Sequence, residues 1–131
     1  MGAKDIEIIE TGVLGPDVPV SAAARFGDLI YVSGNLGNRH GTLELVEGGI
    51  GPETRQALAN MRATLEAAGS AVDRVIKVNI YIVDMAEFAT LNEVYLEFFG
   101  AHRPARATVA VKELGLSARV EIECVAAALS G

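Results

Sequence analysis

The segment Ala118-Arg-Val-Glu-Ile-Glu-Cys-Val-Ala-Ala-Ala-Leu129 predicts a β-strand that is apolar on both of its sides. Side chains alternate along a strand, so the even-numbered residues from Val120 to Ala128 share one side, while Val125 and Leu129 lie on the other. A strand with two apolar sides is covered on both of them. This strand therefore belongs in the middle of a layered structure.

The remaining elements follow from hydrophobic periodicity and from the positions of glycine and proline. Alternating apolar residues predict strands at residues 5–10, 21–26, 28–33, 74–83 and 105–111, with room for a short one at 43–46. In the strand at 74–83, the even-numbered residues from Ile76 to Ile82 are expected on one face. Helical spacing predicts one helix from about Pro52 to Gly69, and a second from the capping box Asp84-Met-Ala-Glu87 to Gly100.

This order of elements predicts an α+β fold in a single domain that spans residues 1–131. About six strands would form one sheet, with both helices on one face of it. The chain then has no helix left for the other face. The simplest cover for the second apolar side of strand 118–129 is another subunit, so we expect a homo-oligomer.

The composition excludes several classes of function. The 11 Lys and Arg residues against 17 Asp and Glu residues give a formal net charge of −6, and no run of basic residues occurs. Clustered Lys and Arg are needed to bind phosphates, so we expect no nucleic-acid partner. The sequence shows no transmembrane span or signal peptide, and a single cysteine excludes an internal disulfide. We therefore expect a cytoplasmic protein that binds no membrane.

The candidate chemistry lies in two segments, Arg103-Pro-Ala-Arg-Ala-Thr-Val109 and Val120-Glu-Ile-Glu123. A guanidinium held on a strand, such as that of Arg106, suits a small carboxylate because it donates two parallel hydrogen bonds. A carboxylate nearby, for which Glu121 is the candidate, can transfer a proton or activate a water molecule. Two other interpretations stay open when these residues are taken alone. Arg106 is also typical of an arginine that forms a structural ion pair, and one of the two glutamates is also typical of an exposed surface residue.

Strand parity predicts which way these side chains point. In the strand at 105–111, Val109 lies on the apolar side, so Arg106 and Thr108 lie on the opposite one. In the last strand, Glu121 lies opposite the more apolar, even-numbered side. If both apolar sides face the same layer, Arg106 and Glu121 point the same way.

The sequence predicts no metal site and no nucleotide motif. His40 and His102 have no second ligand at metal spacing, and Cys124 alternates with apolar residues as a core residue does. The pattern Gly34-x-x-Gly37-x-x-x-Gly41 opens no helix and lacks Gly-Lys-Ser/Thr, so it is a weak phosphate-binding signal.

Several motifs together resemble the RidA/YjgF family of reactive-intermediate (enamine/imine) deaminases. The resemblance covers nearly the whole chain. Its most specific part is Arg-Pro-Ala-Arg, ending at Arg106, followed fifteen residues later by Glu-Ile-Glu from Glu121. The other motifs are Gly15-Pro16, Pro19-x-Ser-x-Ala23, Ser33-Gly34-Asn35 and Phe88-Ala-Thr-Leu-Asn92-x-x-Tyr95.

The resemblance implies a chorismate-mutase-like fold, a six-stranded mixed sheet with two helices on one face, which assembles as a homotrimer with three clefts between subunits. It implies hydrolytic deamination of small 2-aminoacrylate-like acids without a metal or organic cofactor. Arg106 would hold the substrate carboxylate, and Glu121 would position or activate water. The residues expected to contact the substrate besides Arg106 are Ser33, Gly34, Thr108, Val20 and Asn92. The family's topology also places the last strand elsewhere in the sheet, so direct pairing of the last two strands is not expected.

Two positions depart from the best-studied branch of that family. Val20 stands where that branch has a tyrosine, and Thr108 stands where it has a cysteine. A binding module that holds a metabolite carboxylate without turnover therefore stays open as the alternative function. The acidic composition weighs against the ribonuclease and translation-inhibitor labels that some relatives carry.

Overall fold

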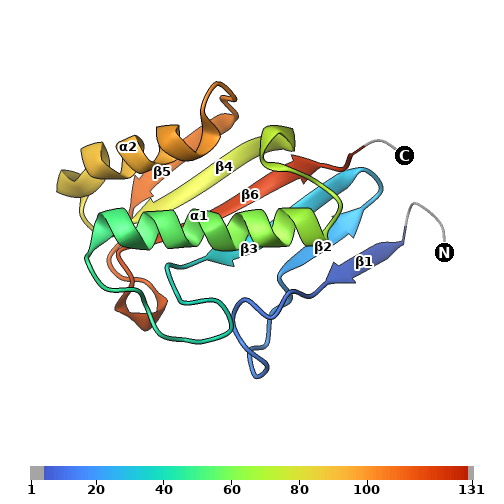
Figure 1. The fold of residues 1–131 in the computed structure, drawn as a ribbon, viewed down its shortest axis with the longest axis horizontal. Coiled ribbons are helices and arrows are strands. Elements are labelled where there is room, and N and C mark those ends of the chain that lie inside the picture. Colours follow the sequence, from blue (N-terminus) through green and yellow to red (C-terminus); the bar gives the residue numbers. More distant parts are fainter. Residues whose placement is uncertain (1–4, 130–131) are drawn as a thin grey trace.

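The computed structural model describes residues 5–129 and contains six strands and two α-helices (Figure 1). The strands are β1 (Ile6–Ile9), β2 (Ala23–Phe26), β3 (Leu29–Asn35), β4 (Val75–Ile82), β5 (Ala105–Ala110) and β6 (Val120–Ala127). The helices are α1 (Ile50–Ala67) and α2 (Phe88–Phe99), and three short 3₁₀ turns lie between elements.

All six strands form one mixed sheet in the order β1-β2-β3-β6-β4-β5. The last strand, β6, lies in the middle and pairs antiparallel with β3 on one side and with β4 on the other. The edge strand β5 pairs with β4 in parallel. The expected six-stranded mixed sheet is therefore confirmed, and so is the placement of the last strand away from β5.

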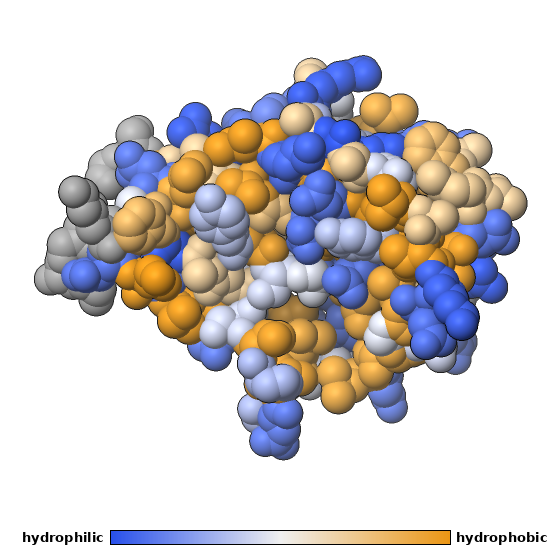
Figure 2. All heavy atoms as spheres, turned by 180° about the vertical axis from the view of Figure 1, so that it is seen from behind, coloured by the Kyte–Doolittle hydropathy of each residue, from blue (hydrophilic) through white to orange (hydrophobic). Residues whose placement is uncertain are grey.

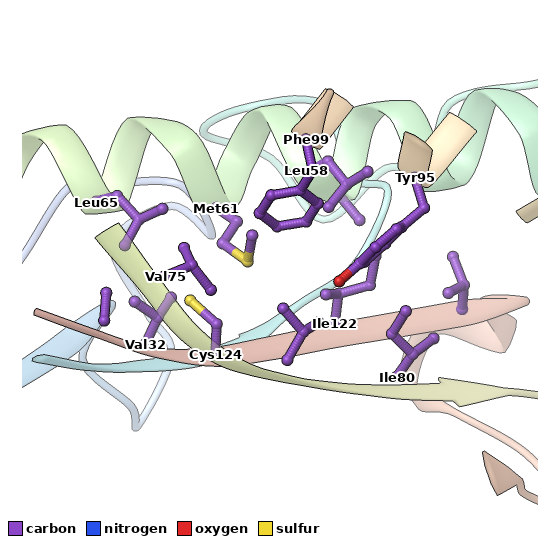
Figure 3. Close-up of a cluster of buried hydrophobic side chains, with 14 of the residues drawn as sticks. Val32, Leu58, Met61, Leu65, Val75, Ile80, Tyr95, Phe99, Ile122 and Cys124 are labelled. Atoms are coloured by element: carbon purple, nitrogen blue, oxygen red, sulfur yellow. The ribbon is translucent and has the colours of Figure 1, made fainter. Parts of the chain in front are cut away.

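Both helices cover the same face of the sheet, as predicted (Figure 1). The core lies between the helices and the sheet, where Leu58, Met61 and Leu65 of α1 meet the buried side chains of the strands (Figure 3). On β6 the buried side chains are the even-numbered ones, from Val120 to Ala126. The predicted alternation of this strand is therefore correct.

The opposite face of the sheet carries exposed hydrophobic side chains. Phe26 pairs with Ile6, and Tyr31 pairs with Val125 of β6, so these side chains share that face. Ile6, Phe26 and Tyr31 are 67%, 49% and 53% exposed. Figure 2 shows this face from the side opposite the helices, with hydrophobic residues spread across it among polar ones. No helix of residues 5–129 covers this face.

Some local predictions were wrong. The expectation that Ile76 belongs to the buried side of its strand fails, because the register of β4 shifts between Val75 and Lys77. This β-bulge buries Val75 to 2% exposure and leaves Ile76 46% exposed. No strand forms at 43–46, where only a single bridge joins Leu45 to Asn38.

The helix boundaries also differ from the predicted ones. Helix α1 begins at Ile50, before Pro52, which therefore occupies the first turn. The Asp84 carboxylate does accept a hydrogen bond from the amide of Ala86, but the residues that it caps form a 3₁₀ turn, Met85–Glu87, ahead of α2. None of the helices in the described part of the chain combines the length and hydrophobicity of a bilayer-crossing segment.

Candidate active site

Arg106 lies on the edge strand β5, and its side chain packs under helix α2. The parallel register places Arg106 beside Val78 and Thr108 beside Ile80, and both partners on β4 are buried under the helices. Side chains of paired residues share a face, so Arg106 and Thr108 point toward the helix layer. The Arg106 Nε atom donates a hydrogen bond of 2.9 Å to the Thr108 hydroxyl.

Two aromatic rings of α2 support the Arg106 guanidinium. Its central carbon lies 4.6 Å from the centroid of the Tyr95 ring and 5.5 Å from that of Phe88. Both distances are within the range of attractive cation–π contacts. Among the described residues, no carboxylate forms an ion pair with Arg106. The guanidinium is therefore held by rings and a hydroxyl, while its terminal nitrogens are left for an anion.

Tyr95 is a residue whose role the sequence pattern did not reveal. It lies one helical turn after Leu91 on α2, and it is only 7% exposed. Its ring descends from α2 toward the sheet (Figure 3), and its hydroxyl is buried without a hydrogen-bond partner among the described residues. Burial raises the pKa of the Tyr95 hydroxyl, and the charge of Arg106 opposes that effect. Tyr95 therefore both packs in the core and supports the Arg106 guanidinium.

A cavity of about 360 Å³ opens beside Arg106. Its lining includes Asn92 and Tyr95 of α2 and the segment from His102 to Pro104. Asn92 was expected to contact substrate, and the structure places it in the same cavity as Arg106. We refer to Arg106, Thr108 and Asn92 as the cationic half-site.

Glu121 lies on β6 and points toward the open face of the sheet. It pairs with Tyr81 of β4, while its neighbours Val120 and Ile122 are fully buried on the helix side. The Glu121 carboxylate lies directly against Gly34 of β3, where a Cβ atom would overlap it. Any residue other than glycine at this position would displace the carboxylate.

The other expected contact residues gather near Gly34. Ser33 donates a hydrogen bond of 2.6 Å from its hydroxyl to the Ser21 carbonyl oxygen. Ser33, Gly34 and Val20 line a second cavity of about 230 Å³, beside the loop that carries Val20. We refer to Glu121, Gly34, Ser33 and Val20 as the acidic half-site.

A second carboxylate influences Glu121. Glu123 is two residues further along β6 on the same face, and it accepts a hydrogen bond of 3.2 Å from the Asn79 amide. Partial burial raises the pKa of Glu121, and the negative charge of Glu123 adds to the increase. A raised pKa makes a carboxyl group a better proton donor and acceptor near neutral pH.

The two half-sites lie on opposite faces of the sheet, which corrects the expectation from strand parity. Arg106 points toward the helices, whereas Glu121 points away from them. The expectation assumed that the apolar side of β5 faces the core, but Val109 on that side is 47% exposed. The reason is that β5 is an edge strand, and the side that faces the helices is the one that carries Arg106, whose side chain packs on Tyr95 and Phe88.

Other candidate residues lie outside the two half-sites or serve packing. Cys124 is buried in the core, and burial raises the pKa of its thiol to about 12. Gly37, part of the weak phosphate pattern, packs so closely on the Glu53 backbone that a Cβ atom would clash. Within residues 5–129, no group of three or more His, Cys, Asp or Glu side chains could hold a metal ion.

We expect Tyr95→Leu to weaken the binding of a small carboxylate such as pyruvate by about three- to tenfold, because the ring under Arg106 is lost. Tyr95→Phe keeps the ring and should stay within about twofold of the wild type. Isothermal titration calorimetry measures both variants. In an Arg106→Ala background, Tyr95→Leu should have no further effect, since the two side chains act together. An undiminished effect there would contradict the role of the ring.

We expect Glu121→Gln to raise the melting temperature at pH 7 under conditions in which the chain is monomeric, where no arginine of a second copy faces the carboxylate. The folded-state pKa of Glu121 lies above its ordinary value of 4.5, so the ionised carboxylate destabilises the folded protein at neutral pH. Below about pH 4.5 the carboxyl group is protonated in both the folded and unfolded states, and the increase in melting temperature should vanish. Calorimetric scans at pH 7 and pH 3.5 check this, with Glu113→Gln, at an exposed position, as the control. A gain of equal size at both pH values would contradict the expectation.

Comparison with known proteins identifies the family of this chain. Residues 13–128 match the protein family described as endoribonuclease L-PSP. The chain is 44% identical over 110 residues to a 2-iminobutanoate/2-iminopropanoate deaminase of Dermatophagoides farinae, covering 84% of this chain and 86% of that protein. It is 39% identical over 115 residues to the human protein of the same name, and the match covers 88% of this chain and 82% of the human protein.

The fold is shared with solved structures as well. The crystal structure of E. coli TdcF with bound serine superposes with a TM-score of 0.86 at 33% identity, covering 94% of this chain and 99% of that one. The match over most of the chain and the identity to these relatives lead to one conclusion. The chain belongs to the endoribonuclease L-PSP family, which includes the RidA/YjgF and RutC proteins.

Proposed function

We propose that this protein hydrolyses small reactive imines and enamines of 2-amino acids, releasing a keto acid and ammonia. The observation that carries the proposal is the Arg106 guanidinium, which is held on two aromatic rings and has no carboxylate partner among the described residues. Two relatives at 44% and 39% identity are named as deaminases of such imines. The structurally similar TdcF is described with bound serine, a small molecule that bears a carboxylate.

The reaction requires the two half-sites to meet, and one chain holds them on opposite faces of its sheet. We therefore propose that the cationic half-site of one copy faces the acidic half-site of another, in a homotrimer with three such clefts. The exposed hydrophobic residues of the open face, such as Phe26 and Tyr31, support this assembly because a second copy would bury them. A closed ring is the usual result when one surface binds a different surface of the same protein.

In the proposed cleft, the substrate carboxylate receives two hydrogen bonds from the terminal nitrogens of Arg106. An enamine such as 2-aminoacrylate first takes up a proton on its terminal carbon and becomes the protonated imine. Water then adds to the C2 carbon of the imine, with Glu121 of the second copy accepting a proton from it. The same carboxyl group can return the proton to nitrogen. The C–N bond then breaks as the C2 hydroxyl loses its proton and becomes the keto group, and ammonia leaves. The products are the keto acid and ammonia.

The other residues of the half-sites would orient the substrate. Thr108 fixes Arg106 through the hydrogen bond to Nε, and Asn92 presents an amide to the same cavity. Gly34 lets the Glu121 carboxylate lie close to the β3 backbone. Val20, which is 52% exposed, offers an apolar surface. No residue of this set calls for a metal or an organic cofactor in the proposed reaction.

The alternative function is a binding module that holds a small metabolite carboxylate without turnover. The observation in its favour is that Val20 supplies no hydroxyl group at a position on the rim of the acidic half-site. Cleavage of RNA, which the family description names, is a weaker candidate because the chain has a formal net charge of −6. A cytoplasmic location remains a prediction, since relatives in fission yeast and Arabidopsis are named as mitochondrial and chloroplastic.

Freshly generated 2-aminoacrylate tests the reaction, with ammonia release as the readout. Arg106→Lys should impair turnover nearly as much as Arg106→Ala, because lysine keeps the charge but loses the two parallel hydrogen bonds. Glu121→Gln should slow turnover by about 10²-fold while keto-acid binding stays largely intact, and Glu123→Gln should have a smaller effect. Normal turnover in Arg106→Ala would refute the deaminase. If neither glutamate variant slows turnover, the binding module becomes the better proposal.

The shared cleft predicts complementation between two inactive variants. Arg106→Ala and Glu121→Gln proteins are denatured together in equal amounts and refolded. Random assembly should restore roughly a quarter of the clefts, because that fraction combines an intact arginine from one copy with an intact glutamate from another. Each variant refolded alone is the control. If the mixture stays as inactive as its components, or light scattering shows a monomer at micromolar concentration, the shared cleft is refuted.

A further inference from the structure

A second arginine lines the cavity that holds Arg106, and the proposed reaction of a simple monocarboxylic imine does not use it. Arg103 lies on the loop between α2 and β5 and shares this cavity with Arg106 and Asn92. No carboxylate of the described residues lines the cavity. In the whole chain, acidic residues outnumber basic ones by 17 to 11. The cavity is therefore a local concentration of positive charge in an acidic protein.

The backbone beside Arg103 is held in place. The Nε2 atom of His102 lies 2.7 Å from the Val75 carbonyl oxygen, and its ring lies 6.1 Å from that of Phe99, between centroids. Pro104 follows directly and restricts the backbone. The Arg103 side chain itself is exposed, and none of the ion pairs within residues 5–129 includes it. An anchored backbone thus presents a free guanidinium at the cavity.

We propose that Arg103 binds a second anionic group, so that this site favours imino acids whose side chain ends in a carboxylate. The inference rests on the proposed function, in which Arg106 takes the first carboxylate. At roughly 30 Å³ for each water-sized group, a cavity of about 360 Å³ has room for a five-carbon dicarboxylic acid. A second guanidinium would select such a substrate by charge and by paired hydrogen bonds.

The test compares two stable keto acids of equal length, 2-oxopentanedioate and 2-oxopentanoate, which differ only in whether the chain ends in a carboxylate or a methyl group. We expect the dicarboxylate to bind the wild-type protein about three- to fivefold more tightly in calorimetry, the range for an exposed ion pair. Raising the salt concentration should narrow the difference, because salt screens exposed charges. Equal affinity, or weaker binding of the dicarboxylate, would overturn the inference.

Matched variants assign the preference to Arg103. Arg103→Gln should abolish the difference between the two acids and leave 2-oxopentanoate binding unchanged, while Arg103→Lys should keep part of it. Arg62→Gln removes the same charge from α1, outside the cavity, and should keep the full difference. If Arg62→Gln reduces the difference in affinity between the two acids as much as Arg103→Gln does, the preference reflects net charge and the inference is wrong. Binding of 2-oxopentanoate to Arg106→Ala tests the proposed function separately: undiminished binding there would refute the carboxylate site itself.

Discussion

The fold depends on the antiparallel pairing of β6 with both β3 and β4. This strand joins the β1–β3 part of the sheet to the β4–β5 part, and without it the chain would consist of two separate small sheets. Its even-numbered side chains fill the core beneath the helices, and its odd-numbered side carries Glu121 and Glu123 on the open face. The packing of the core and the position of the candidate acidic half-site therefore depend on the same register, because a slip by one residue would exchange the two faces.

Arg106 shows how a charged side chain can be held without an ion pair. A carboxylate partner would fix the guanidinium but would also occupy the hydrogen bonds that an anionic ligand needs. Here Tyr95 and Phe88 supply an attractive surface, and Thr108 accepts from Nε alone. Because β5 is at the edge of the sheet, the guanidinium can be packed on one side and still border a cavity. Position in the sheet thus makes the arginine both fixed and available.

The acidic half-site follows a different physical rule. Gly34 has no side chain, so the Glu121 carboxylate can lie against the β3 backbone, where it is partly removed from water. Removal from water and the neighbouring Glu123 both disfavour the charged form of Glu121. In the proposed trimer, the cation that would offset this cost belongs to another copy. The same arrangement that makes the isolated chain incomplete would then favour assembly.

Much of this structure could be predicted from the sequence alone. Alternation in residues 118–129 correctly identified the buried side of β6, and the spacing of apolar residues located both helices to within a few residues. The residues that the family resemblance singled out form two groups in space, since Arg106, Thr108 and Asn92 lie together, as do Glu121, Gly34, Ser33 and Val20. Their roles stay predictions. The strand and helix predictions succeeded because alternation and helical spacing are local properties of the chain.

Only the tertiary structure decided which face of the sheet each side chain occupies. Parity relates neighbouring residues within one strand, but it does not say which side of an edge strand meets the helices. The arginine side of β5 faces α2 because the parallel register with β4 and the aromatic rings of the helix hold it there. The bulge that turns Ile76 outward is likewise a product of pairing between strands. The sequence by itself determined the elements and singled out the candidate site residues, whereas the separation of Arg106 from Glu121 arose from long-range pairing that no local pattern records.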